Sequence, residues 1–286
     1  LDVLKRLFVS YVVQSEESIS EGFRSCLDLV AIGTLADLMP LQDENRILVN
    51  VGIERINANP RGAIRDLITR TNLSGKRIST TDISWQISPL INATGRLGVP
   101  QKAVELFLCE DEVERMALVE EILTLNNERK RLGEHAWESV LTEAKKSYSD
   151  TDGRLIQVGG KTIHRGITGI IASRLSKYFN APAMVVSLME GRAVGSARSV
   201  KGINIKRFLD SFSDIFVDYG GHDYAAGYSM KLEDYERFQK RLFELAENLE
   251  MGDDEQLLVQ IDAELPQQYM TPKLIDVVER FAPFGE

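Results

Sequence analysis

A single histidine stands in a run of small residues in the last quarter of the chain. His222 lies in the segment GGHDYAAG, residues 220–227. Three glycines and two alanines clear space around this imidazole, where bulkier side chains would block a ligand. An imidazole so placed can stabilise negative charge or assist proton transfer near neutral pH. The alternative is a purely structural histidine, and the small neighbours favour a functional one.

A second segment alternates hydroxyl groups with an arginine. In GSARS, residues 195–199, Ser196, Arg198 and Ser199 could all donate hydrogen bonds to one phosphate. The alternative interpretation is a polar edge strand with no ligand.

Two glycine-containing segments could also hold an anion. Residues 164–169, HRGITG, precede an expected helix, and a glycine-rich helix entry offers backbone N–H groups and a positive dipole end. Residues 92–98, NATGRLG, place Arg96 between two glycines, where its guanidinium suits phosphate oxygens. Ordinary helix capping and a turn with an exposed arginine are the respective alternatives.

One acid stands in an otherwise apolar turn. Asp37 lies in GTLADLMPL, residues 33–41, after an apolar run that we interpret as a buried strand over residues 27–34. Burying a carboxylate is costly unless it is paired or bound to metal, and Mg²⁺ and Mn²⁺ prefer oxygen ligands. A helix N-cap or a salt bridge remains the alternative.

The elements that must position these residues follow from the hydrophobic periodicity. Helices are expected over residues 1–25, 47–56, 64–71, 111–147, 166–179, 206–212, 235–249 and 272–281, and Ser79 could cap a further short element. Strands are expected over residues 155–158, 183–188, 193–197 and 224–230, with another beginning at Leu257. A helix as long as 111–147 more often bridges two domains than lies inside one.

The charge is unevenly distributed. The whole chain carries a formal net charge of −9, yet residues 155–209 hold nine lysines and arginines and only one acid, Glu190. A basic block in an acidic chain is typical of a phosphate-binding face, and a solvated surface paired with other segments is the alternative.

Composition excludes several classes of protein. Two cysteines, Cys26 and Cys109, cannot build a disulfide framework, which favours a reducing, cytoplasmic location. The sequence contains no apolar run of about 18 residues, so no membrane association is expected. Because residue 1 is not Met, the chain is interpreted as part of a longer protein.

Together these segments resemble the DHH phosphoesterase family, and most closely its RecJ branch. Residues 28–41 are similar to the fourth motif of the metal-binding domain. Residues 164–175, 195–199 and 220–227 are similar to the DHH-associated substrate domain. Residues 92–98 and the final APFGE are similar to RecJ proteins in particular.

The resemblance implies an α/β fold in several parts. Residues 1–108 would be the end of the DHH domain, 109–150 a long connecting helix, 151–250 the DHH-associated domain and 251–286 the start of an OB-fold. The active site would lie between the two domains. The resemblance also implies a pair of Mn²⁺ or Mg²⁺ ions, with Asp37 as a metal ligand and, with His222, a catalytic residue. The substrate-binding positions implied are Arg96, His164, Arg165, Ser196, Arg198, Ser199, Gly220 and Gly221.

The family's paired aspartates and its Asp-His-His triplet find no counterpart in this sequence and are expected upstream of residue 1. The activity implied is metal-dependent 5′→3′ hydrolysis of single-stranded DNA in recombination and repair, with this part alone inactive. The protein would act as a monomer, and a single-strand-binding protein or a helicase is a further expected partner. A phosphodiesterase for oligonucleotides or cyclic dinucleotides, and a non-catalytic DNA-binding relative, are the alternatives.

Overall fold

The computed structural model describes residues 24–200, 202–249, 261 and 264–285. They divide into two compact units. The first comprises the described residues up to Thr94, then Val99–Asn126 and the C-terminal 264–285; the second comprises Gly95–Gly98 and the described residues from Asn127 to Ile261. The expected helix over residues 1–25 and the strand expected from Leu257 fall almost entirely outside the described residues.

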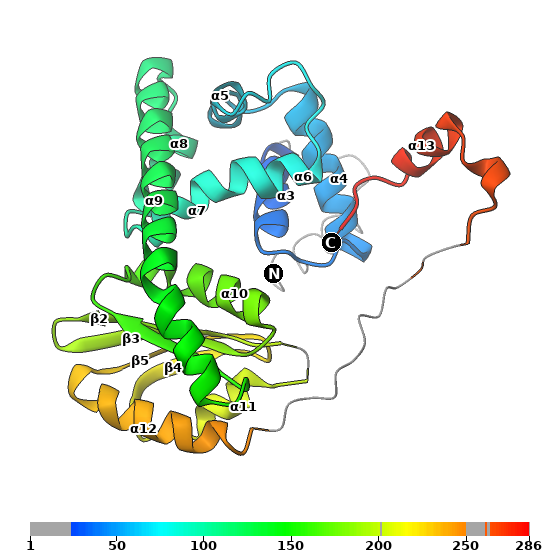
Figure 1. The fold of residues 1–286 in the computed structure, drawn as a ribbon. Coiled ribbons are helices and arrows are strands. Elements are labelled where there is room, and N and C mark those ends of the chain that lie inside the picture. The colour runs from blue at the N-terminus through cyan, green and yellow to red at the C-terminus, as the bar shows by residue number, and fades with distance from the viewer. Residues whose placement is uncertain (1–23, 201, 250–260, 262–263, 286) are drawn as a thin grey trace, which may run out of the picture. The chain divides into compact units, whose positions relative to one another are not determined.

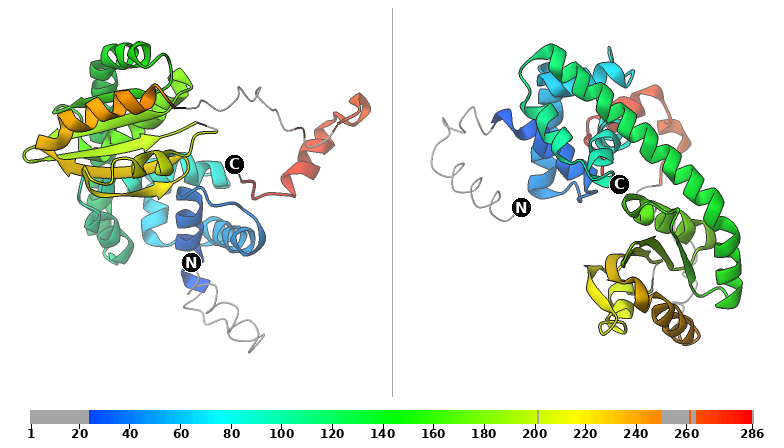
Figure 2. Two further views of the ribbon diagram at one scale, coloured as in Figure 1. Left: turned by 90° about the horizontal axis from the view of Figure 1, so that it is seen from below. Right: turned by 90° about the vertical axis from the view of Figure 1, so that its left-hand side faces the viewer.

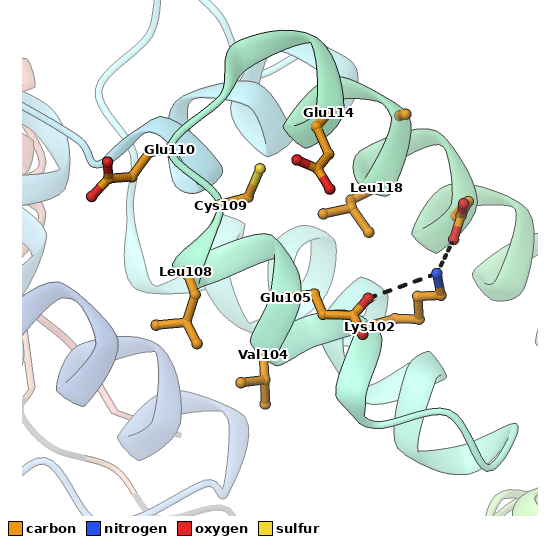
Figure 3. Close-up of a pocket in the computed structure, with 10 residues that line it drawn as sticks. Lys102, Val104, Glu105, Leu108, Cys109, Glu110, Glu114 and Leu118 are labelled. Carbon is orange, nitrogen blue, oxygen red and sulfur yellow. Dashed lines mark ion pairs between the residues drawn. The ribbon is translucent and has the colours of Figure 1, made fainter.

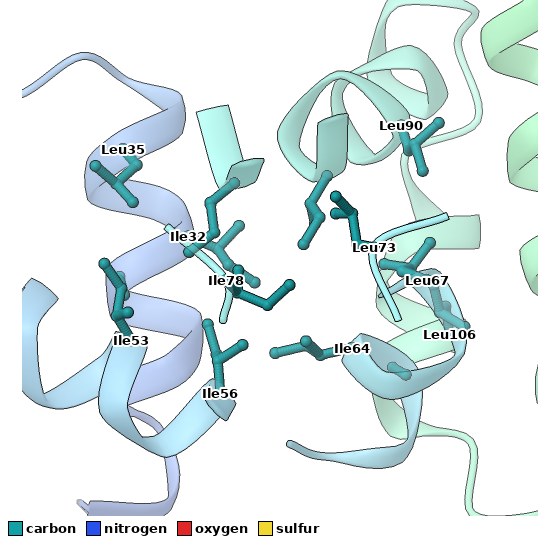
Figure 4. Packing of buried hydrophobic residues seen from close by; sticks show 14 of the residues in the cluster. Ile32, Leu35, Ile53, Ile56, Ile64, Leu67, Leu73, Ile78, Leu90 and Leu106 are labelled. Atoms are coloured by element: carbon teal, nitrogen blue, oxygen red, sulfur yellow. The ribbon is translucent and has the colours of Figure 1, made fainter. Parts of the chain in front are cut away.

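The first unit is helical where it is described. Its elements are α3 (Leu27–Ala36), α4 (Asp43–Ala58), α5 (Gly62–Arg70), α6 (Thr80–Asp82), the π-helical turn η1 (Ile83–Ile87), α7 (Ser88–Arg96), α8 (Gln101–Leu108), η4 (Gln267–Tyr269) and α13 (Pro272–Glu279). Ser79 caps α6 in a reciprocal capping box with Asp82, as its position predicts. Aliphatic side chains from α3, α4, α5 and α8 fill one core, which includes Ile53, Ile64 and Leu106 (Figure 4).

The strand expected over residues 27–34 is wrong, because this segment belongs to α3. The buried positions Leu27, Ala31 and Leu35 recur every four residues, which is helical spacing. Since a buried helix is apolar on most sides, its short hydrophobic run cannot be told from a buried strand by composition.

A single helix contributes to the cores of both units. α9 runs without interruption from Glu112 to Asp150 and confirms the expected long helix (Figure 2). Its Val119 and Ile122 lie in the core of the first unit, and its Ala136 and Val140 lie in a core of the second. No helix among the described residues combines the length and hydrophobicity that crossing a bilayer requires.

The second unit is a five-stranded sheet with helices on both faces (Figure 1). The strand order is β1-β2-β3-β5-β4, and only the β1–β2 pair is parallel. The strands are β1 (Ile156–Gly160), β2 (Ala183–Met189), β3 (Arg192–Arg198), β4 (Phe216–His222) and β5 (Ala225–Lys231). The helices are α10 (Thr168–Phe179) after the 3-10 turn η2 (Arg165–Ile167), α11 (Ile205–Asp210) and, after η3 (Leu232–Asp234), α12 (Tyr235–Ala246).

Alternation along the strands builds the two cores of this sheet. In β2, Ala183 and Val185 pack with α9 and α10, whereas Met184 and Val186 pack with α11 and α12. A strand covered on both faces is apolar throughout, which is why β2 is predictable from the sequence. The α/β class with a long helix before a sheet domain is thereby confirmed.

Sequence patterning missed β4. Only Phe216 of this strand is buried, and its later residues include Gly220 and Gly221. As an edge strand, β4 is held through backbone pairing with β5 rather than by an apolar pattern.

The described C-terminal residues contact α4 within the first unit. The Arg46 guanidinium of α4 donates to the Pro283 carbonyl at 2.7 Å and also to the Phe281 carbonyl. Residues 264–285 contain η4 and α13 and no strand, so the expected start of an OB-fold is not confirmed by the part of the chain described here.

Candidate functional site

The second unit brings four of the sequence segments to one end of its sheet. On β3, Ser196 and Arg198 are separated by one residue, so their side chains lie on the same face, while Ala197 is buried on the other. The Ser196 hydroxyl lies 2.9 Å from the hydroxyl of Thr168, the first residue of α10. The strand therefore presents a hydroxyl and a guanidinium beside the amino end of a helix.

The Arg198 guanidinium lies against this helix end. A Cβ atom at Gly169 would lie 2.8 Å from Arg198 Nη2 and 3.6 Å from Ser196 Oγ, so a larger residue there would displace the end of the Arg198 side chain. Backbone N–H groups at a helix amino end carry partial positive charge, as the guanidinium carries a full one. An anion between them would interact favourably with both.

Two further arginines contribute to the same positive region. Partial desolvation lowers the pKa of the Arg198 guanidinium, and the charge of Arg96 lowers it further. The same two effects, in the same order, lower the pKa of Arg129 on α9. The pKa of Arg96 is itself lowered by desolvation. Desolvated like charges repel each other, and a bound anion relieves that repulsion.

Close backbone contact fixes Arg96 in this region. The Arg96 carbonyl oxygen lies so near Gly166 that a Cβ atom there would be only 1.7 Å from it. The Arg96 guanidinium donates to the Gly166 carbonyl at 3.4 Å. Arg96 and the segment 164–169, whose roles the sequence leaves open, therefore lie together within the second unit.

His164 and Arg165 take different positions around η2. The His164 Nδ1 atom accepts a hydrogen bond from the Gly166 N–H at 3.1 Å, which caps the turn. Arg165 is exposed, and its Nη2 atom lies 3.9 Å from where a Cβ of Gly98 would stand. Ser199 lies beyond β3, and its hydroxyl donates to the Ile203 carbonyl at 2.8 Å inside its own loop.

His222 is aligned with Arg198 across the sheet. Both residues pair with Ala225 of β5, Arg198 from β3 and His222 from β4. Directly paired residues point to the same face, and two strand spacings separate the Cα atoms of Arg198 and His222 by roughly 10 Å. In the next row on this face of the sheet, Ser196 and Gly220 both pair with Gly227.

The sheet surface between Arg198 and His222 is exposed and carries few side chains. Gly227 and His222 are exposed, and a Cβ at Gly220 would meet nothing within 4 Å. Gly221 has a φ of +152°, and a Cβ there would lie 2.3 Å from the Ala225 carbonyl. Gly221 therefore allows a backbone conformation that other residues rarely adopt. Gly220 and Gly227 leave the surface between Arg198 and His222 without side chains.

The basic block of residues 155–209 includes an arginine that is engaged by other side chains. Arg198 lies at the site, whereas Arg174 pairs with Glu134 at 3.1 Å and covers the Trp137 ring at 4.1 Å. Arg129, whose pKa the charge of Arg96 lowers, lies outside the block. No pattern in the sequence distinguishes it from the other charged residues of the run ERKR, residues 128–131.

Asp37, the acid in the apolar turn of the first unit, is exposed. Asp37 is the C-cap of α3 and lies at the surface. The buried acid of that helix is Asp28, which accepts two hydrogen bonds of 2.7 Å from the Arg61 guanidinium. Among the described residues, no group of three or more His, Cys, Asp or Glu side chains could hold a metal ion. These residues alone therefore do not fit a metal pair.

Known proteins share this architecture and much of this sequence. Residues 152–248 match the DHHA1 domain. Over 264 residues the chain is 34% identical to the single-stranded-DNA-specific exonuclease RecJ of Bacillus subtilis (strain 168), covering 91% of this chain and 33% of that protein. The crystal structure of RecJ in complex with Mg²⁺ from Thermus thermophilus is 31% identical and superposes with a TM-score of 0.79, covering 92% of this chain and 40% of that one.

A crystal structure of exonuclease RecJ bound to manganese is 33% identical with a TM-score of 0.66, over 79% of this chain and 56% of that one. Residues 152–248, which contain the five-stranded sheet, are therefore a DHHA1 domain. The chain as a whole is a RecJ-like stretch of the DHH phosphoesterase family. It spans about one third of the Bacillus subtilis relative and 40% of the Thermus structure.

Proposed function

We propose that this chain supplies the phosphate-binding part of a 5′→3′ exonuclease that hydrolyses single-stranded DNA. The observation that carries the proposal is the arrangement on one sheet face of Arg198, Ser196 and the amino end of α10, joined by Arg96 and Arg129. Guanidinium groups, hydroxyls and helix N–H groups are the donors that proteins use for phosphate oxygens. Single-stranded DNA is supported as the substrate by the named activity of the RecJ relatives.

Within this proposal the site residues have distinct roles. Arg198, Arg96 and Ser196 hold backbone phosphates in the ground state. His222 faces the reacting phosphate across the open floor of Gly220 and Gly227, where it can stabilise charge or move a proton. His164 and Gly221 shape the loops around the site, and Arg165 and Ser199 stand at its edge.

Divalent metal use is supported by solved RecJ structures that contain Mg²⁺ or Mn²⁺. Such ions neutralise charge on a phosphate and activate water when bound. Asp37 is the one described position proposed as a ligand, and its exposed carboxylate is free of the buried pairing that holds Asp28. The other ligands are expected in the part of the longer relatives that this chain does not cover. A cytoplasmic DNA-repair role, a monomeric state and a single-strand-binding protein or helicase as partner complete the proposal.

Replacing Arg198 by alanine tests the binding role. Loss of a charge-assisted contact should weaken binding of a 5′-phosphorylated, 3′-labelled single strand by roughly 10–100-fold. Fluorescence anisotropy measures the affinity. Arg237→Ala is the matched control, because Arg237 is an exposed arginine of α12 that pairs with Asp214. Equal affinities in the Arg198 variant and the control would remove Arg198 from the DNA-binding surface.

The chain by itself should not digest DNA. Because Asp37 is the only proposed metal ligand among its residues, purified residues 1–286 should release no nucleotides from single-stranded DNA in Mn²⁺. Acid-soluble release from a labelled strand is the measurement, with a purified RecJ relative as the positive control. Robust Mn²⁺-dependent release that copurifies with the chain and is lost in Asp37→Ala would show that the site is complete within it.

A further inference from the structure

The first unit carries a groove that is separate from the phosphate-binding residues. It lies between α8 and the first turns of α9 and encloses about 500 Å³ (Figure 3). Its apolar lining includes Val104 and Leu108, one helical turn apart on α8, and Leu118 on α9. All of these residues belong to the first unit.

Two aliphatic side chains of α8 are largely exposed to solvent. The side of α8 that carries Ala103 and Leu106 is buried in the core, yet Val104 is 58% exposed and Leu108 is 75% exposed. Single exposed aliphatic residues are common, but two on adjacent turns that line the same hollow form a surface that a partner can cover.

The rim of the groove is acidic. Four glutamates line it, and the one basic lining residue, Lys102, is engaged by Glu121 at 2.8 Å and by Glu105 at 3.7 Å. Glu110 and Glu114 pair with no cation among the described residues (Figure 3). Burial and the nearby Glu114 carboxylate raise the pKa of the Cys109 thiol, which agrees with a negative potential in the groove.

Exposed aliphatic residues beside an acidic rim indicate which kind of ligand the groove can bind. Uncompensated carboxylates repel the phosphates of a nucleic acid and attract lysine and arginine. Two aliphatic residues at i and i+4, beside a second helix, suit the apolar face of a short amphipathic helix. We propose that the groove between α8 and α9 binds a basic amphipathic helical segment of a partner protein. Its aliphatic residues would contact Val104 and Leu108, and its cations would pair with Glu110 and Glu114.

A synthetic peptide tests the proposal. The probe is a helical peptide with leucines at i, i+3, i+4 and i+7 and lysines at the other positions, and the control peptide replaces every lysine by glutamate. Titration calorimetry with residues 1–286 should show binding of the lysine peptide only. The double variant Glu110→Lys, Glu114→Lys should weaken that binding by at least about tenfold.

Two controls localise the contact. The double variant Glu138→Lys, Asp150→Lys makes the same change of net charge at exposed positions of α9 in the second unit, and it should retain the affinity. Bound peptide should also slow alkylation of Cys109, which lines the groove, and leave alkylation of the exposed Cys26 unchanged.

Several results would overturn the proposal. Equal loss of affinity in both charge-reversed variants would mean that the peptide responds only to net charge. Unprotected Cys109 would place the peptide elsewhere. Light scattering tests the remaining alternative. A dimer that forms in the wild type and disappears in the double variant Glu110→Lys, Glu114→Lys would mean that a second copy of this chain occupies the groove. Circular dichroism of each variant verifies that the helices are intact.

Discussion

In the longer exonuclease to which this chain is proposed to belong, His222→Ala should lower turnover by about 10²–10⁴-fold. The same variant should change DNA affinity little. His222 lies two strands away from Arg198 on the same face of the sheet, with only Ala225 between them. Its imidazole is therefore placed to act on a phosphate that the arginines hold, rather than to hold that phosphate itself. Single-turnover digestion of a 5′-phosphorylated strand, measured beside equilibrium binding, separates the two effects.

His135→Ala is the matched control, because His135 is an exposed histidine on α9 outside the site. That variant should digest DNA at the rate of the wild type. Near-normal turnover in His222→Ala would return His222 to a structural role. Parallel losses of binding and turnover in both His222→Ala and Arg198→Ala would mean that the two residues do not divide the work as proposed.

Gly166→Ala should destabilise the second unit by about 3 kcal/mol, the upper part of the range for overpacking. A methyl group at this position would lie 1.7 Å from the Arg96 carbonyl oxygen, which belongs to the backbone and cannot rotate away. The segment 95–98 would have to shift, and the Arg96 guanidinium would shift with it. We therefore expect lower stability in chemical denaturation together with weaker binding of single-stranded DNA.

Gly133→Ala should have the opposite sign. Gly133 lies inside α9, and a Cβ there would meet nothing within 4 Å. Alanine in a helix interior is more favourable than glycine by about 1 kcal/mol, so this variant should be more stable than the wild type. If Gly166→Ala proved as stable as Gly133→Ala and bound DNA normally, the close contact between Arg96 and Gly166 would not exist in solution.

The elements that the sequence predicts well are those with a strong apolar period or complete burial. β2 is apolar throughout because helices cover both of its faces, and α9 keeps an apolar stripe through two different cores. The same local alternation that places Ser196 and Arg198 on one face of β3 is visible in the sequence. For that reason the shared face of Ser196 and Arg198 is predictable from the sequence, whereas their role in binding stays a prediction.

The remaining features depend on contacts between distant segments. Arg129 joins the site through its place on α9 near Arg96, and no residue beside it in sequence indicates this. The strand β4 is recognisable only through its pairing with β5. Asp28 differs from Asp37 by its partner Arg61, which is 33 residues further along the chain, so the different burial of the two acids cannot be predicted from the sequence.

Salt dependence of DNA binding tests the central claim that the arginines of the sheet unit hold phosphates. The affinity of residues 1–286 for a single-stranded oligonucleotide should fall steeply between about 50 and 200 mM salt. The slope of log K against log salt should become shallower by about 1.4 in the double variant Arg96→Ala, Arg198→Ala, because each phosphate contact to a single strand contributes about 0.7. The double variant Arg237→Ala, Arg241→Ala, at two arginines that pair with Asp214, should keep the wild-type slope. An affinity that is insensitive to salt, or a slope that is the same in wild type and in the Arg96, Arg198 variant, would contradict the account.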